Sequence, residues 1–88
     1  MVDKKKILYE KLKKSSTNAS FKDICKLAEE VDFVFRNQNG SHKIYKHPIL
    51  KATMNFQPDK RDKSKAKKYQ IVQLIKFIDD NNLIKGEK

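Results

Sequence analysis

The chain has little of what would cross-link it or place it in a membrane. Its 88 residues include one cysteine, Cys25, so neither an intramolecular disulfide nor a Cys-x-x-Cys metal site can form. No apolar run approaches the roughly 20 residues that span a bilayer. The first residues, MVDKKKILYE, have no apolar segment and no small-residue cleavage site of a signal peptide. We therefore expect one small cytoplasmic domain that makes no contact with a membrane.

Cys25 itself lies in a pattern with Phe21, Ile24 and Ala28 that places all four on one helical face. Such a face is usually buried. We therefore expect Cys25 to be an inert, buried thiol rather than a nucleophile.

Positive charge, in contrast, is abundant and unevenly spread. Lysine and arginine outnumber the acids 21 to 11, and the net charge is +10. Residues 33–70 contain ten basic and two acidic residues, so they carry +8, whereas residues 1–32 carry +2 and residues 71–88 are neutral. Much of the excess falls on expected strands and loops rather than on an amphipathic helix, so nucleic acid is a better partner than a membrane surface.

Two helices are expected before the basic middle of the chain. Apolar residues at helical spacing predict a short helix over 4–14. The segment SSTNAS, residues 15–20, interrupts it, because hydroxyl and amide side chains compete for backbone hydrogen bonds. Ser20, with Asp23 three residues later, resembles a capping box and predicts a second helix over 21–31.

The hydrophobic period then changes to that of strands. Residues 33–36 form a short β-prone run, and Asn39-Gly40 signals a hairpin, because both residues tolerate positive φ. Residues 41–47 form the returning strand. Residues 50–56 alternate between apolar and polar side chains, as a half-buried third strand does.

A last helix is expected over 66–80, after a polar loop, with Val72 and Phe77 widening its buried stripe. This order predicts an α+β fold, in which helices cover one face of a three-stranded antiparallel sheet. We assign residues 1–19 to an N-terminal helical extension and residues 20–84 to the domain.

His42, just after the hairpin, is the candidate catalytic residue. Imidazole exchanges a proton near neutral pH, and RNA carries its own nucleophile, the 2′-hydroxyl, so a histidine beside cations can cleave RNA without a metal. Gly40 lets a phosphate approach the backbone closely, and the Ser41 hydroxyl offers it a hydrogen bond. The spacing alone favours a plain surface histidine at a strand start. Alternation also leaves open whether the ring faces the helices.

Other polar residues near the hairpin have a binding and a structural interpretation. His47 lies five positions from His42, so the two rings point to opposite faces and do not share a metal; we expect no metal and no other cofactor. His47 is either structural or a phosphate contact, and Tyr45 either stacks on a base or packs on the sheet. The residues expected to bind RNA are Arg36, Lys43, Lys46 and Lys51, with Lys65, Lys67 and Lys68 near the start of the last helix.

The run FVFRNQNGSHKIYKHP, residues 33–48, resembles the HicA family of bacterial toxins. The shared features are an aromatic-rich strand, a polar turn, Gly-Ser-His, an apolar–aromatic pair, a basic residue and His-Pro. In this chain they are Gly40, Ser41, His42, Ile44-Tyr45, Lys46 and His47-Pro48. The order of elements is similar over about residues 20–83.

The resemblance implies a fold like that of double-stranded-RNA-binding domains and the activity of an mRNA interferase. The family's catalytic histidine maps onto His42 and its glycine onto Gly40, and a HicB-like antitoxin is the implied partner. Our main interpretation is therefore a metal-independent endoribonuclease that cleaves mRNA, with His42 as general base or general acid. Residues 1–19 and the third strand, LKATMNF, depart from the family pattern.

Two alternatives come from other classes. A non-catalytic double-stranded-RNA-binding module would use the lysines at the start of the last helix in the same way. A DNA-binding helix-turn-helix would use the helices at 4–14 and 21–31. The linker between these helices has no glycine, and the excess charge lies elsewhere, so we place this alternative last.

Overall fold

The computed structural model describes residues 4–14 and 19–84 and has the expected α+β architecture. The strands form one antiparallel sheet in the order β1-β2-β3. Residues 15–18 of the segment expected to separate the first two helices lie outside the described residues. The elements are α1 (Lys4–Lys14), α2 (Phe21–Glu30), β1 (Val34–Asn39), β2 (His42–His47), β3 (Ala52–Phe56) and α3 (Lys68–Asp80).

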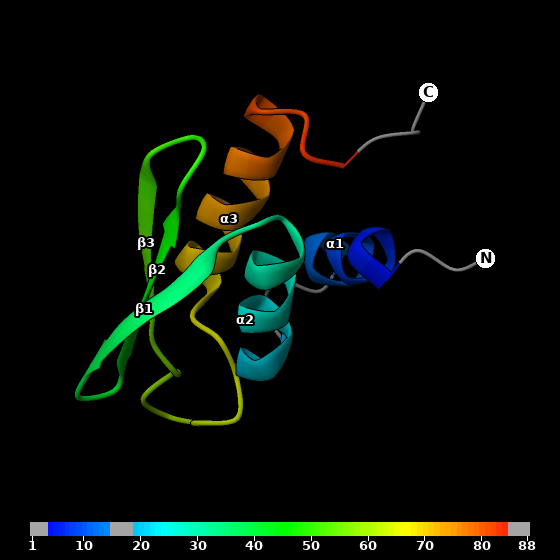
Figure 1. Cartoon of the computed structure of the whole chain (residues 1–88). Coiled ribbons are helices and arrows are strands. Elements are labelled where there is room, and N and C mark those ends of the chain that lie inside the picture. The colour runs from blue at the N-terminus through cyan, green and yellow to red at the C-terminus, as the bar shows by residue number, and fades with distance from the viewer. Residues whose placement is uncertain (1–3, 15–18, 85–88) are drawn as a thin grey trace.

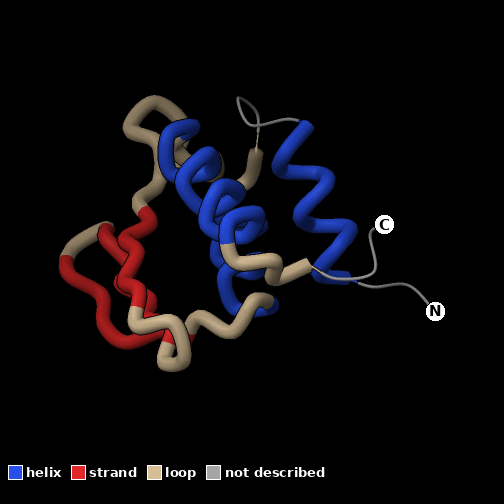
Figure 2. The backbone as a smooth tube through the Cα atoms, turned by 90° about the horizontal axis from the view of Figure 1, so that it is seen from above, coloured by secondary structure: helices blue, strands red, loops and turns tan. Residues whose placement is uncertain are grey.

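The elements stack in layers (Figures 1 and 2). The sheet has α2 and α3 against one face, and α1 packs on the far side of these two helices. Apolar side chains from every layer are buried in one cluster, including Leu8 and Leu12 of α1, Ile24 and Leu27 of α2, Tyr45 and Phe56 of the sheet, and Ile71, Leu74 and Ile78 of α3. The opposite face of the sheet is not covered by these helices.

Polar contacts cap α2 and join α1 to the two helices beneath it. Ser20 caps α2 as expected, since its Oγ accepts the Asp23 N–H at 3.4 Å. The Asp23 carboxylate forms an ion pair with Lys11 of α1, at 2.9 Å. On the other side of α1, the Tyr9 hydroxyl donates a hydrogen bond to Asp79 of α3.

Some boundaries differ from those expected. The third strand begins at Ala52 rather than Leu50, because Lys51 has a φ of 57° and ends the turn after β2. The last helix begins at Lys68 rather than residue 66. Ala66 instead bridges to Pro58, and its N–H donates to the Ala19 carbonyl at 2.9 Å. Ala66, where the helix was expected to begin, therefore pairs with the preceding loop instead.

Replacement of Leu12 tests whether α1 is part of the folded core. Leu12 is fully buried, so Leu12→Ala should lower the free energy of unfolding by about 2–4 kcal/mol, through lost burial and the cavity left behind. Ile7 on the same helix is 50% exposed, and Ile7→Ala is the matched control with little expected effect. Urea unfolding followed by circular dichroism measures both. Equal midpoints for Leu12→Ala and the unmodified protein would contradict the packing of α1.

Candidate active site

The hairpin between β1 and β2 places His42. Asn39 pairs with His42, so the loop consists of Gly40 and Ser41 only. Gly40 has a φ of +64°, and Ser41 is not among the residues with positive φ, as in a type II′ turn, whose first central position requires glycine. The turn is thus shifted by one residue from the expected Asn39-Gly40 pair. A Cβ on Gly40 would meet no atom within 4 Å, so glycine is needed for its backbone conformation, and space remains open beside it.

Strand alternation settles which way His42 points. Tyr45 and His47 are 2% and 3% exposed, so they occupy the face that packs against the helices. Ile44 lies on the opposite, outer face, where it pairs with exposed Asn55. His42 has the same parity as Ile44 and is itself exposed. The imidazole therefore lies on the uncovered face of the sheet, at the shoulder of the hairpin.

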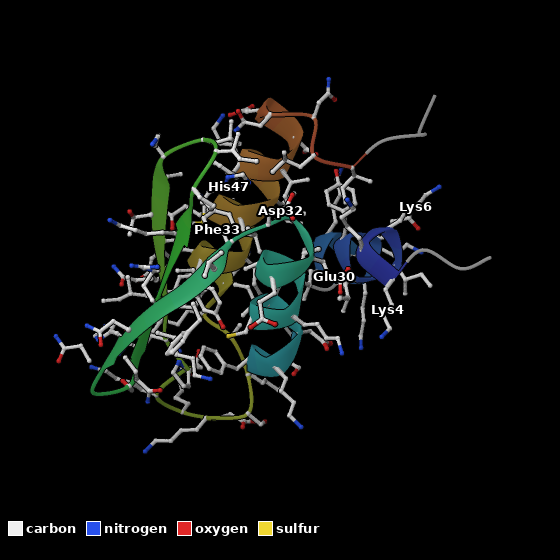
Figure 3. The ribbon with its side chains drawn as sticks, viewed as in Figure 1. Lys4, Lys6, Glu30, Asp32, Phe33 and His47 are labelled. Atoms are coloured by element: carbon white, nitrogen blue, oxygen red, sulfur yellow. The ribbon has the colours of Figure 1, made fainter. Side chains whose placement is uncertain are left out.

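His47 has a structural role, which is one of its two expected interpretations. Its Nδ1 accepts the Leu50 N–H at 3.1 Å, and its Nε2 therefore donates to the Val31 carbonyl at 3.0 Å. The ring packs edge-on against Phe33, with centroids 5.2 Å apart, and lies 6.0 Å from Phe77 of α3. Figure 3 shows His47 and Phe33 together between the sheet and the helices. Both ring nitrogens of His47 are thus used to join β2 to its surroundings.

The outer face also gathers cations near the turn between β2 and β3. Arg36, Lys46 and Lys51 line a shallow groove of about 370 Å³ together with Val34, Pro48 and Thr53. Arg36 sits at an irregularity in the pairing of β1 with β2, which redirects a side chain from the regular alternation. Lys46 is four residues along β2 from His42, roughly 13 Å at the rise of a strand. One extended strand of nucleic acid on this face would reach both.

Lys43 and Tyr45 do not belong to this surface. Lys43 is half-buried on the inner face, where its Nζ lies 5.8 Å from the centre of the Phe21 ring. Tyr45 packs in the core between Phe35 and Phe56, with centroids 5.6 Å away from each. The possibility that Tyr45 stacks on a base is therefore wrong, because its ring is closed off from the surface.

Cys25 is buried beside Tyr45, as expected for an inert thiol. Burial raises the pKa of the Cys25 thiol, and a hydrogen bond to Tyr45 opposes this in part. Burial also raises the pKa of the Tyr45 phenol, with smaller contributions from Cys25 and from Glu29, whose carboxylate accepts its hydroxyl at 3.3 Å. Both groups therefore keep their protons at neutral pH and neither faces a substrate.

The remaining predicted lysines lie at the start of α3 or just before it, and two of them, Lys67 and Lys68, line a second basic surface. Lys65 bridges to Ser20 in the loop before α3, Lys67 donates from its Nζ to Gln57 Oε1 at 2.9 Å, and Lys68 is exposed at the first position of α3. We call the groove of about 740 Å³ at this place the α3 groove; it is lined by Asp59, Lys60, Arg61, Lys67, Lys68, Tyr69 and Val72.

The exposure of two residues of the α3 groove was not predicted from the sequence. Val72 was expected to widen the buried stripe of the last helix, but it is 51% exposed. Tyr69 was not considered, and it is 60% exposed. The sequence pattern could have predicted this exposure. Ile71, Leu74 and Ile78 form the buried i, i+3, i+7 row of the helix, and Tyr69 and Val72 both lie off that row.

Neither a group of metal ligands nor a membrane-spanning helix is found in the described residues. Within residues 4–14 and 19–84, no three His, Cys, Asp or Glu side chains gather as metal ligands would. No helix in this part of the chain is long and apolar enough to cross a bilayer.

The structure is thus a small α+β domain that carries an exposed histidine after a Gly-Ser turn, beside a basic outer face. A family model described as the HicA toxin of bacterial toxin–antitoxin systems matches residues 21–78, which is 58 of the 88 residues. The chain belongs to this family and is the toxin type of such a pair, which implies a cognate antitoxin. Neither a curated protein nor a solved structure gives a significant match.

The two histidines should differ sharply in their effect on stability. His47→Leu removes both ring hydrogen bonds and leaves the Val31 carbonyl unpaired, so it should lower the free energy of unfolding by about 1–3 kcal/mol. His42→Ala, at an exposed position, should change it by less than about 0.5 kcal/mol. Thermal unfolding of the two variants measures this. Similar melting temperatures for both variants would contradict the assignment of His47 to the core.

The thiol gives an independent test of the core. Because its raised pKa and its burial both suppress the thiolate, Cys25 should react slowly with a disulfide reagent such as Ellman's reagent at pH 8. In a denaturing urea concentration, the same thiol should react at the rate of a small-molecule thiol. Rapid reaction of the folded protein, at a rate equal to that in urea, would show that Cys25 is accessible.

Proposed function

We propose that this toxin is an endoribonuclease that cleaves mRNA without a metal ion, with His42 as its general acid or general base. The observation that carries the proposal is the exposed imidazole at the hairpin, on the same open face as Arg36 and Lys46. Membership of the family supports it, since the run from Gly40 to Pro48 resembles the family's motif. An imidazole beside a cationic face can supply the proton transfer that metal-free cleavage of RNA needs.

The chemistry uses the nucleophile that RNA supplies. As general base, His42 takes the proton of a 2′-hydroxyl while the 2′-oxygen bonds to phosphorus and the bond from phosphorus to the 5′-oxygen breaks. As general acid, His42 instead gives a proton to that departing 5′-oxygen. Either role yields one product with a 2′,3′-cyclic phosphate and one with a 5′-hydroxyl. Water takes the role that His42 does not, so we expect slow turnover.

The basic residues divide the work of binding. Arg36, Lys46 and Lys51 lie toward the turn between β2 and β3, so they would hold the strand on that side of the reacting phosphate. The reacting phosphate would sit beside Gly40, where the lack of a side chain leaves open space, and within reach of the Ser41 hydroxyl. Lys43 would contribute only to the field around the hairpin.

The proposal includes the partner and the place of action. A HicB-like antitoxin would neutralise the toxin, and an acidic surface on it would complement the basic outer face. The cytoplasm, where mRNA is translated, is the proposed compartment.

A second function is favoured by a different observation. Lys67 and Lys68, at the start of α3, correspond to the position where double-stranded-RNA-binding domains contact phosphates. A protein that used this surface alone would bind RNA without cleaving it.

Replacement of His42 separates the two functions. His42→Ala should reduce cleavage of a labelled RNA by about 100-fold or more, because general acid–base catalysis is lost. It should also abolish growth inhibition on induction, while RNA affinity remains within about twofold. Lys26→Ala, at an exposed site on α2, is the matched control and should retain cleavage.

Metal dependence completes this test. Cleavage by the unmodified protein should continue in excess EDTA and give ends that carry a cyclic phosphate. Two results would each overturn the proposed mechanism. One is cleavage by His42→Ala at the unmodified rate, and the other is complete loss of cleavage in EDTA that added Mg²⁺ restores.

A further inference from the structure

The α3 groove combines two kinds of exposed side chain. Its cationic members are Lys60, Arg61, Lys67 and Lys68, and Asp59 also lines it. Tyr69 and Val72 lie three positions apart on α3, so they are neighbours on its surface, and both are more than half exposed. An aromatic ring and a methyl-bearing side chain among cations is the composition of a surface on which nucleic-acid bases stack while their phosphates are held.

The loop that carries the cations is firmly held. The Asp59 N–H donates to the Lys65 carbonyl at 2.8 Å, and the Asp59 carboxylate accepts the Arg61 N–H at 2.8 Å. Asp62 accepts both the N–H and the hydroxyl of Ser64, and these bonds lower the pKa of its carboxyl group. The acids of the loop are thus engaged with loop backbone and with Ser64. Lys60 and Arg61 thus belong to a loop whose backbone is hydrogen-bonded without a ligand, and such preorganisation reduces the entropy cost of binding.

The α3 groove is linked to the hairpin through Gln57. Lys43 pairs with Phe56, so the position across from His42 is that of Gln57, one residue beyond the end of β3. Gln57 Oε1 accepts a hydrogen bond from Lys67, and the Gln57 N–H donates to Gln70 Oε1 at 2.9 Å. Gln70 in turn donates to the Tyr69 hydroxyl at 3.4 Å. Figure 1 shows the hairpin tip and the loop before α3 at the same end of the molecule.

We propose that the α3 groove binds single-stranded RNA next to the cleavage position, with a base stacked on Tyr69 and phosphates held by Arg61 and Lys68. This rests on the proposed ribonuclease function and adds to it the residue that selects where the strand is held. A double helix keeps its bases stacked inside, so it offers Tyr69 no exposed base face. An unpaired strand offers both the base and the flexible backbone needed to turn from α3 to His42.

The test measures binding apart from cleavage. All variants are made in a His42→Ala background, and affinity for a labelled 12-nucleotide single-stranded RNA is followed by fluorescence anisotropy. Stacking on one base is worth about 1–3 kcal/mol, so Tyr69→Ala should weaken binding by about 5- to 150-fold. Tyr69→Phe keeps the ring and should stay within about threefold. Lys26→Ala, outside the groove, is the control for loss of an exposed side chain.

A fluorescent probe tests the stacking directly. The chain contains no tryptophan, so Tyr69→Trp introduces a single indole whose emission should fall on addition of single-stranded RNA. Ile7→Trp places the indole on α1, beyond the covering helices, and its emission should not change. A duplex of the same sequence should quench Tyr69→Trp less than the single strand does at equal occupancy.

The outcomes distinguish this inference from the ribonuclease function. Equal affinity of Tyr69→Ala and its background, or unchanged emission of Tyr69→Trp at saturating RNA, overturns the stacking site while wild-type cleavage can still stand. Equal quenching by duplex and single strand overturns the choice of an unpaired ligand. Lack of any RNA binding, together with lack of cleavage by the unmodified protein, would overturn both.

Discussion

The site depends on one constraint, the anchoring of β2 by Tyr45 and His47. Both side chains are buried against the helices, and both ring nitrogens of His47 are hydrogen-bonded to backbone. Since strand side chains alternate, a slip of one residue would bury His42 and expose Tyr45. The core thus fixes the direction of the imidazole through the register of β2. The two histidines, five positions apart, have opposite surroundings for this reason.

Seven of the ten basic residues in 33–70 line one of two surfaces. One is the outer face, where Arg36, Lys46 and Lys51 lie toward the turn between β2 and β3. The other is the α3 groove, beyond the opposite end of β3. His42 lies between the two surfaces. From His42, β2 runs toward the first surface, and Gln57, which lies across from His42, is hydrogen-bonded to Lys67 of the second. Under the proposed function, a bound strand would therefore be held on both sides of the phosphate that reacts.

Much of this arrangement could be predicted from the sequence. Hydrophobic period gave the order of elements, and the Gly40-Ser41-His42 run gave the candidate site. The face of the sheet on which His42 lies could not be predicted. Ile44 and Tyr45 are neighbours in β2, so each face of the strand has one apolar residue that could be buried. Only the packing of Tyr45 against Phe56 shows which face is buried. The turn was placed one residue early, since Asn39 and Gly40 both tolerate positive φ and local sequence does not fix the register. The exposure of Tyr69 could have been predicted, because Tyr69 lies off the buried row of α3, but its grouping with Lys60 and Arg61 depends on the path of the preceding loop.

The cysteine, the second histidine and the buried tyrosine cannot exchange a proton with a substrate at this site. Cys25 and Tyr45 keep their protons and are buried, and His47 is bonded at both nitrogens. Of the chain's two histidines and single cysteine, all within the described residues, only His42 is exposed. In the proposed ribonuclease, acid–base catalysis from one imidazole is limited, so most of the rate would come from holding the 2′-oxygen, phosphorus and 5′-oxygen in line. Accurate positioning of the strand, through surfaces on both sides of the hairpin, then matters as much as the histidine itself.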